Sequence, residues 1–218
     1  MIYFEQVVKN YQDTGTEVLK QASFHIKPGE MCFLTGASGS GKTTVLRLLL
    51  RESVPDDGSI RVNGENIVKL KDRKIPAYRR KVGMIFQDYK LIKDRTVYEN
   101  VALAKILSGA PEREIRAQVA RTLRMVGMEE KFQRYPEELS CGEQQRVGIA
   151  RAIINKPYVI LADEPTGNLD PQNTREILLL LERINQQLGI TILVATNDLD
   201  SIRDLSYRNL QIKKGRIQ

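Results

Sequence analysis

The sequence predicts an α/β protein with a mostly parallel core sheet, an antiparallel β part near the N-terminus and an α-helical insert. Short, continuous apolar runs alternate with helical segments, and such runs are typical of parallel strands that are buried on both faces. Near the N-terminus apolar and polar residues alternate, as they do in antiparallel strands with one exposed face. From about residue 96 to residue 155 the pattern is helical, with no convincing strand.

These patterns give approximate positions for the individual elements. Core strands are expected at residues 31–35, 82–86, 158–162 and 190–195, and antiparallel strands at 3–7, 23–26 and 59–62. Helices are expected at 44–51 and 173–188. Pro171 suits the first turn of the second helix, and Gly189 suits its C-terminal cap.

The chain of 218 residues is long enough to bury a hydrophobic core without disulfides, and we expect one domain over 1–218. Its core is expected at about 1–86 and 156–218, and its α-helical subdomain at about 87–155. Within that subdomain four apolar residues share one helical face, and Pro111 precedes them near the start: Ile115, Val119, Leu123 and Val126.

Composition excludes several classes of protein. The chain has 34 Lys and Arg against 27 Asp and Glu, a net charge of +7, and 41% of its residues are hydrophobic, which excludes intrinsic disorder. The only cysteines, Cys32 and Cys141, exclude a disulfide framework and favour a reducing compartment. No apolar stretch approaches the roughly 20 residues of a transmembrane helix and no signal peptide is recognisable, so a cytoplasmic location is expected.

A phosphate-binding loop is the most specific motif. Residues 36–43 read GASGSGKT and match G-x-x-x-x-G-K-[ST] between a predicted strand and a predicted helix. Such glycines let successive backbone N–H groups point at phosphate, and the helix dipole adds positive potential. Lys42 is expected to reach the β- and γ-phosphates, and Thr43 to bind Mg²⁺. The nucleotide-binding residues expected here are Gly36, Ala37, Ser38, Gly39, Ser40, Gly41, Lys42, Thr43 and Thr44.

An acidic pair follows the apolar run at 158–162. A phosphate-binding loop needs a metal-holding acid at the end of a second buried strand, and Asp163 is in that position. Glu164, the next residue, is a candidate to orient or deprotonate the attacking water.

Two further motifs make the chain resemble the ATP-binding-cassette (ABC) family of ATPases over essentially its whole length. Residues 139–146, LSCGEQQR, resemble the family signature LSGGQ, and residues 163–170, DEPTGNLD, resemble its Walker B and D-loop. The resemblance implies an ABC-type nucleotide-binding domain that hydrolyses ATP with Mg²⁺. It also implies that Tyr11 stacks on adenine, that Gln87 touches Mg²⁺ and a membrane partner, and that Asp170 lies at a dimer interface.

The signature motif also predicts the start of a helix, independently of the resemblance. Ser140 and Glu143 have the spacing of a capping box, so a helix is expected to start here. The resemblance adds that Ser140, Gly142 and Glu143 face the γ-phosphate held by a second chain. Two chains would then form a head-to-tail homodimer over two ATP molecules.

Two positions depart from the family pattern. Cys141 replaces a glycine in the signature, and a Cβ there would crowd a close approach to phosphate. Asn197 replaces the switch histidine, and its amide can donate a hydrogen bond to the γ-phosphate but cannot become a cation. His25, the only histidine, is expected to be a structural strand residue. We hypothesise that both departures weaken closure of the site between two chains, or hydrolysis, while ATP binding survives; a catalytically silent regulatory subunit is the alternative.

Between the motifs, residues 86–91 (FQDYKL) and 95–101 (RTVYENV) resemble the bacterial cell-division branch of the family, the FtsE ATPases. That branch works with FtsX, an integral membrane protein, and its motion controls peptidoglycan hydrolysis. The resemblance therefore implies a location on the inner face of the plasma membrane, with a partner groove near 87–93. The ATPase of a lipoprotein-release or macrolide-type exporter remains the alternative.

The positive net charge is compatible with two other kinds of partner, anionic lipid and nucleic acid. The basic stretch 69–81, KLKDRKIPAYRRK, is a candidate to face anionic lipid, or it is an ordinary solvated surface. A DNA-organising ATPase would need long coiled coils between its motifs, and residues 87–140 leave room only for a compact insert, so no nucleic acid is expected.

Overall fold

The structure is a computed structural model that describes residues 1–11, 16–203 and 205–218. Its larger sheet has six strands in the order β10-β9-β3-β8-β7-β6. These strands are β3 (Met31–Thr35), β6 (Val82–Ile85), β7 (Val159–Asp163), β8 (Thr191–Thr196), β9 (Arg208–Lys213) and β10 (Arg216–Ile217). All neighbours pair in parallel except β9 and β10, and every residue of β3 and β8 is buried. The predicted parallel core is confirmed.

The smaller sheet is antiparallel and has the order β2-β1-β4-β5. Its strands are β1 (Ile2–Tyr11), β2 (Thr16–Ile26), β4 (Asp57–Val62) and β5 (Glu65–Asn66). This confirms the antiparallel N-terminal part. His25 lies in β2, and its ring stacks on Tyr3 with 4.2 Å between the ring centroids, which agrees with a structural role.

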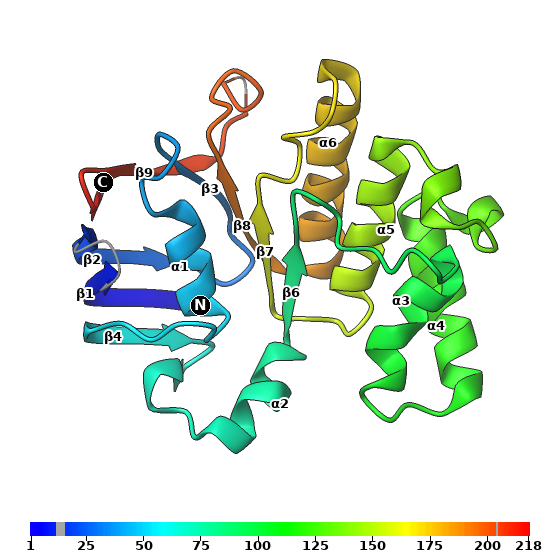
Figure 1. Cartoon of the computed structure of the whole chain (residues 1–218), viewed down its shortest axis with the longest axis horizontal. Helices are drawn as coiled ribbons and strands as arrows, with labels where there is room; N and C mark the ends of the chain where they lie inside the picture. Colours follow the sequence, from blue (N-terminus) through cyan, green and yellow to red (C-terminus); the bar gives the residue numbers. More distant parts are fainter. Residues whose placement is uncertain (12–15, 204) are drawn as a thin grey trace.

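Helices fill the space around the larger sheet. They are α1 (Lys42–Leu49), α2 (Ile75–Arg79), α3 (Val97–Ile106), α4 (Glu112–Met125), α5 (Cys141–Ile153) and α6 (Pro171–Leu188). Apolar residues of α1 share one core with both sheets, so α1 lies between them (Figure 1). The other face of the sheet shares a second core with α5 and α6, and α3 and α4 pack beyond α5 (Figure 1).

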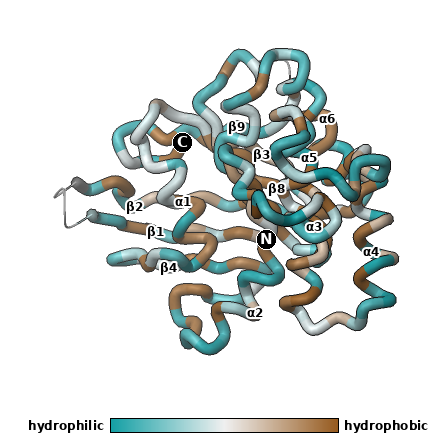
Figure 2. Tube along the Cα trace, turned by 45° about the vertical axis from the view of Figure 1, so that its right-hand side comes forward, coloured by the Kyte–Doolittle hydropathy of each residue, from teal (hydrophilic) through white to brown (hydrophobic). Residues whose placement is uncertain are grey.

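The helical part is fully described, and it contains no strand between residues 96 and 155. Three of the four residues predicted to share one face, Ile115, Val119 and Leu123, are the buried residues of α4, and Pro111 is its N-cap. Figure 2 shows apolar and hydrophilic residues alternating along α4, as expected of a helix that has one face toward its neighbours. None of the described helices combines the length and hydrophobicity needed to span a bilayer.

Both ends of the first predicted helix and the start of the last one differ from the prediction. The first helix begins at Lys42 and ends at Leu49, whereas 44–51 was expected, because Gly41 turns in the left-handed region (φ 109°) and the helix follows it directly. The last helix begins at Pro171 because Asp170 caps it, and it ends at Leu188 before Gly189 (φ 62°). Helix α2 was not predicted, because five residues are too few to show a period.

Candidate functional site

The phosphate-binding loop joins β3 to α1 at the carboxyl end of the larger sheet. Gly41 has φ 109°, and a Cβ there would lie 2.8 Å from the Val18 side chain, so only glycine fits this turn. A Cβ on Gly36 would lie 2.8 Å from the carbonyl oxygen of Ile212. The loop therefore forms a tight cradle in front of the α1 N-terminus, which suits an anion.

Lys42 lies at the centre of this cradle and is only 6% exposed. Its Nζ donates hydrogen bonds to the carbonyl oxygens of Gly36 (2.9 Å) and Ala37 (3.3 Å). The same nitrogen lies 3.5 Å from Oε1 of Glu164. A buried ammonium so held can exchange these oxygens for those of a phosphate at little conformational cost.

The acidic pair at the end of β7 faces the loop. Thr43 Oγ1 donates to Oδ1 of Asp163 at 3.3 Å, which brings the two predicted metal ligands together. Burial raises the pKa of Asp163, although the Thr43 hydrogen bond opposes the shift. No cluster of three His, Cys, Asp or Glu side chains able to hold a metal occurs in the described ranges. Thr43 and Asp163 fit Mg²⁺ that takes its remaining ligands from phosphate and water.

Glu164 directly follows β7 and is held by the end of β8. Its backbone N–H donates to the carbonyl of Ala195 in β8 (2.8 Å), and its Oε2 accepts from the backbone N–H of Asn197 (3.1 Å). Its φ of 45° is unusual for a residue with a side chain, and such conformations persist where the surrounding structure imposes them.

Gln87, beyond β6, borders the same site. Its carbonyl oxygen accepts from Nδ2 of Asn168 at 3.0 Å. A Cβ on Gly167 would lie 3.0 Å from Nε2 of Gln87, so the absence of a side chain at Gly167 leaves room for the glutamine.

These groups line one cavity of about 690 Å³. Its lining residues are Tyr11, Val18, Ser38, Gly39, Gly41, Lys42, Thr43, Thr44, Arg47, Gln87, Asp163, Glu164, Gly167 and Asn197. Val18, Arg47 and Gly167 were not among the sequence candidates: no motif marks Val18 or Arg47, and Gly167 lies in the motif at 163–170 but was not singled out. Tyr11 lies at the edge of the described part of β1, and its hydroxyl lies 3.3 Å from Oγ1 of Thr44. Gly36, Ala37 and Ser40 belong to the loop but do not line the cavity.

The signature residues lie elsewhere. Ser140, Gly142, Glu143 and Asp170 are absent from the described lining of this cavity. Ser140 is the N-cap of α5: its hydroxyl accepts from the Glu143 N–H (3.3 Å), and the Glu143 carboxylate accepts from the Ser140 N–H (3.0 Å). The predicted capping box is confirmed.

The N-termini of α5 and α6 carry the remaining candidates, of which Ser140 and Asp170 are exposed, Glu143 is half-buried and Gly142 is buried. Cys141 is the first residue of α5 and is exposed. Glu143 forms an ion pair with Lys131, and the resulting hydrogen bond, with those from Ser140, holds the pKa of Glu143 below its usual value. Asp170 caps α6 by accepting from the backbone N–H groups of the second and third helical residues, and hydrogen bonds from Asn173 lower the pKa of Asp170. Lys131 and Asn173 were not among the sequence candidates, because neither belongs to a motif that marks the site.

Comparison with known proteins identifies the family. The ABC transporter family model matches residues 19–167. The chain belongs to the ABC transporter family. It is 49% identical to the cell division ATP-binding protein FtsE of Streptococcus pneumoniae strain D39 over all of this chain and 94% of the relative. It is also 49% identical to FtsE of Escherichia coli K12, over all of this chain and 97% of the relative. Its identity to FtsE of Mycobacterium tuberculosis is 44%, over all of this chain and 94% of the relative.

Solved structures of ABC proteins have the same fold. A dimeric post-hydrolysis state of the ATP-binding cassette MJ0796, bound to ADP and Pi, is 34% identical, with a TM-score of 0.89 over all of this chain and 97% of that one. The structure of cbiO1 from Clostridium perfringens, part of an ABC transporter complex, is 33% identical, with a TM-score of 0.92 over 86% of its length. This ABC-type ATPase therefore has the predicted fold.

Proposed function

We propose that this chain is the ATP-hydrolysing subunit of a membrane complex of the FtsE–FtsX type. The observation that carries the proposal is the convergence of Lys42, Thr43, Asp163, Glu164 and Gln87 on one cavity. The identity to FtsE over the whole chain supports the cell-division branch rather than another ABC branch.

The motif residues at the cavity have distinct roles in the proposed reaction. Lys42 and the loop N–H groups bind the β- and γ-phosphates, while Tyr11 holds the adenine. Thr43 and Asp163 hold Mg²⁺, which when bound neutralises charge on the phosphates. Glu164 takes the proton of the attacking water, and the backbone N–H of Asn197 keeps the accepting carboxylate in place.

One chain provides only part of this site. Ser140, Gly142, Glu143 and Asp170 lie outside the described lining of the cavity, at the N-termini of α5 and α6, where Ser140 and Asp170 are exposed. Helix N-termini suit an anion brought by another molecule. Two chains that associate head to tail would each complete the other's site. The similarity to the cassette MJ0796, of which two solved structures are dimeric, supports this arrangement.

The membrane partner is proposed to dock near residues 87–93 and the helical part. We expect ATP-driven closure of the dimer to move this region, and the partner to pass the motion across the membrane to peptidoglycan hydrolases. The test is affinity purification of the tagged chain from mildly solubilised native membranes, with mass spectrometry of its stoichiometric partner. An FtsX-like protein is expected. A lipoprotein-release or macrolide-export permease would keep the nucleotide site and overturn the cell-division role.

Replacing Asn197 with histidine is expected to raise the steady-state ATPase rate by roughly fivefold, because a cation near the γ-phosphate stabilises the charge that develops there during hydrolysis. Asn197 is exposed at the cavity, and its contact with Glu164 uses the backbone N–H, which histidine and alanine both keep. Asn197→Ala is the matched control and should lower the rate. An unchanged or lower rate for Asn197→His would show that this position does not limit hydrolysis.

The basic stretch 69–81 is proposed to face anionic lipid. Of its cations, Arg79 is tied to the carbonyls of Leu50 and Arg51, but Lys71 and Lys74 are exposed, with no carboxylate within 4.0 Å in the described chain. Each such residue near an anionic surface contributes about 1 kcal/mol, or about fivefold in binding.

The double variant Lys71→Gln/Lys74→Gln is therefore expected to bind vesicles that contain anionic lipid about 25-fold more weakly. Co-sedimentation with vesicles measures this. The matched control, Lys213→Gln/Lys214→Gln, removes the same charge from the end of β9 and the turn that follows it, and should bind as the wild type does. Equal wild-type binding to neutral and anionic vesicles would exclude the lipid contact.

A further inference from the structure

The segment that follows Gln87 has an unusual backbone. We call residues 87–96 the Q segment. Tyr89 and Lys90 are successive residues with positive φ, 58° and 49°, and neither is glycine. Left-handed conformations are unfavourable for residues with a Cβ, and two in succession need support from the surrounding structure.

Arg151 of α5 provides that support. Its Nη1 donates to the carbonyl oxygen of Lys90 (2.5 Å) and its Nη2 to that of Tyr89 (2.7 Å). The described chain places no carboxylate within 4.0 Å of this guanidinium, and burial lowers the pKa of Arg151. Its charge is therefore directed at two carbonyl oxygens of the Q segment, and charge-assisted hydrogen bonds of this kind are strong.

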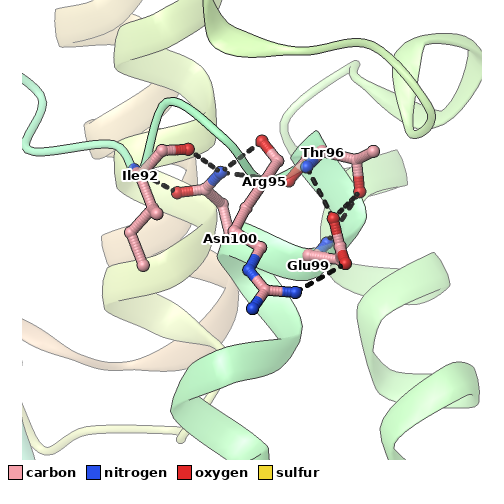
Figure 3. A network of polar contacts seen from close by, with 5 residues as sticks. All are labelled: Ile92, Arg95, Thr96, Glu99 and Asn100. Atoms are coloured by element: carbon pink, nitrogen blue, oxygen red, sulfur yellow. Dashed lines mark hydrogen bonds and ion pairs between the residues drawn. The ribbon is translucent and has the colours of Figure 1, made fainter.

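Asn100 of α3 holds the other end of the Q segment (Figure 3). It is 1% exposed, and its Nδ2 donates to the carbonyl oxygens of Ile92 (3.1 Å), Arg95 (3.0 Å) and Thr96 (3.0 Å). Its Oδ1 accepts from the Ile92 N–H at 2.8 Å. Figure 3 also shows Thr96 and Glu99 capping α3.

The two anchors differ in what they connect. Asn100 ties the Q segment to the start of the helix that directly follows it, so the contact is local in sequence. Arg151 ties it to α5, the helix whose N-terminus carries Ser140 and Cys141. Since Asn168 binds the carbonyl of Gln87, the glutamine is held between this anchor and the loop after β7.

We propose that Arg151 is a positioning residue for ATP hydrolysis: its two hydrogen bonds hold Tyr89 and Lys90 in the left-handed turn and thereby fix Gln87 at the cavity. The same bonds make the Q segment and α5 move together. This inference rests on the proposed role of Gln87 in hydrolysis.

The test compares kcat and ATP affinity in variants of the full chain. Arg151→Lys keeps the charge but loses the planar fork that reaches both carbonyls, so kcat is expected to fall on the order of tenfold with ATP affinity unchanged. Arg51→Lys is the matched control, because the Arg51 guanidinium also donates to two backbone carbonyls, those of Ile67 and Val68, but does not line the cavity. It should keep its kcat.

A second pair of variants leaves α5 untouched. Lys90→Val disfavours positive φ and should reproduce the loss of kcat, while Lys90→Gly loses the same exposed side chain but accepts positive φ and should not. This pair keeps the proposal testable if Arg151→Lys does not fold.

A double-mutant cycle with Gln87→Ala separates positioning from general stability. If Arg151 acts through Gln87, Arg151→Lys should reduce kcat no further in the Gln87→Ala background. An equal further reduction there would overturn the inference, as would a wild-type kcat for Lys90→Val. Wild-type kcat for Gln87→Ala alone would overturn both the role of Gln87 and the inference. If Gln87→Ala lowers kcat as expected but Arg151→Lys leaves kcat unchanged, the role of Gln87 stands and only the inference about Arg151 is overturned.

Discussion

Glu164→Gln is expected to lower the rate of ATP hydrolysis by about 1,000-fold, the scale of a general-base contribution, while ATP still binds. The amide keeps the shape of the carboxylate and can still accept from the Asn197 N–H, which the structure places 3.1 Å from Oε2. It cannot take a proton from water at neutral pH. Head-to-tail dimers should therefore accumulate in Mg-ATP, because they form but do not turn over.

Single-turnover hydrolysis and light scattering after size exclusion measure the two effects. Glu30→Gln is the matched control: its side chain is 18% exposed, against 16% for Glu164, and it pairs with Arg208 at the opposite end of β3. A Glu164→Gln protein that retained a tenth or more of the rate would mean that another group accepts the proton.

Lys42→Met is expected to weaken ATP binding by about 100-fold, because it removes a charge-assisted contact worth about 1.5–3 kcal/mol. The ammonium is held within the loop by the carbonyls of Gly36 and Ala37, and Met has no donor to offer a phosphate. Titration of a fluorescent ATP analogue measures the effect.

Lys105→Met is the control for this substitution, because Lys105 is also largely buried but pairs with Glu114 in the helical part. ATP affinity should be unchanged in that variant. If Lys42→Met bound ATP as the wild type does, the loop N–H groups alone would hold the phosphates.

Much of the nucleotide site could be predicted because its residues are local in sequence. The loop at 36–43 and the acidic pair at 163–164 each lie next to a strand, and parallel strands bring their carboxyl ends together. The signature cap was predictable for the same reason, since Ser140 and Glu143 are three residues apart. Gln87, Tyr11 and Asn197 carry no such local signal and were found only through the family resemblance.

The sequence by itself determined the fold class, the parallel core, the antiparallel N-terminal part and the phosphate-binding loop, because periodicity and turn chemistry are local properties. The tertiary structure decided what depends on distant contacts. It brought Asn197 to Glu164, placed Ser140 outside its own chain's cavity, and directed Arg151 at the carbonyls of Tyr89 and Lys90. No periodicity encodes a hydrogen bond between residues 61 positions apart, since such a contact exists only when the two elements have packed.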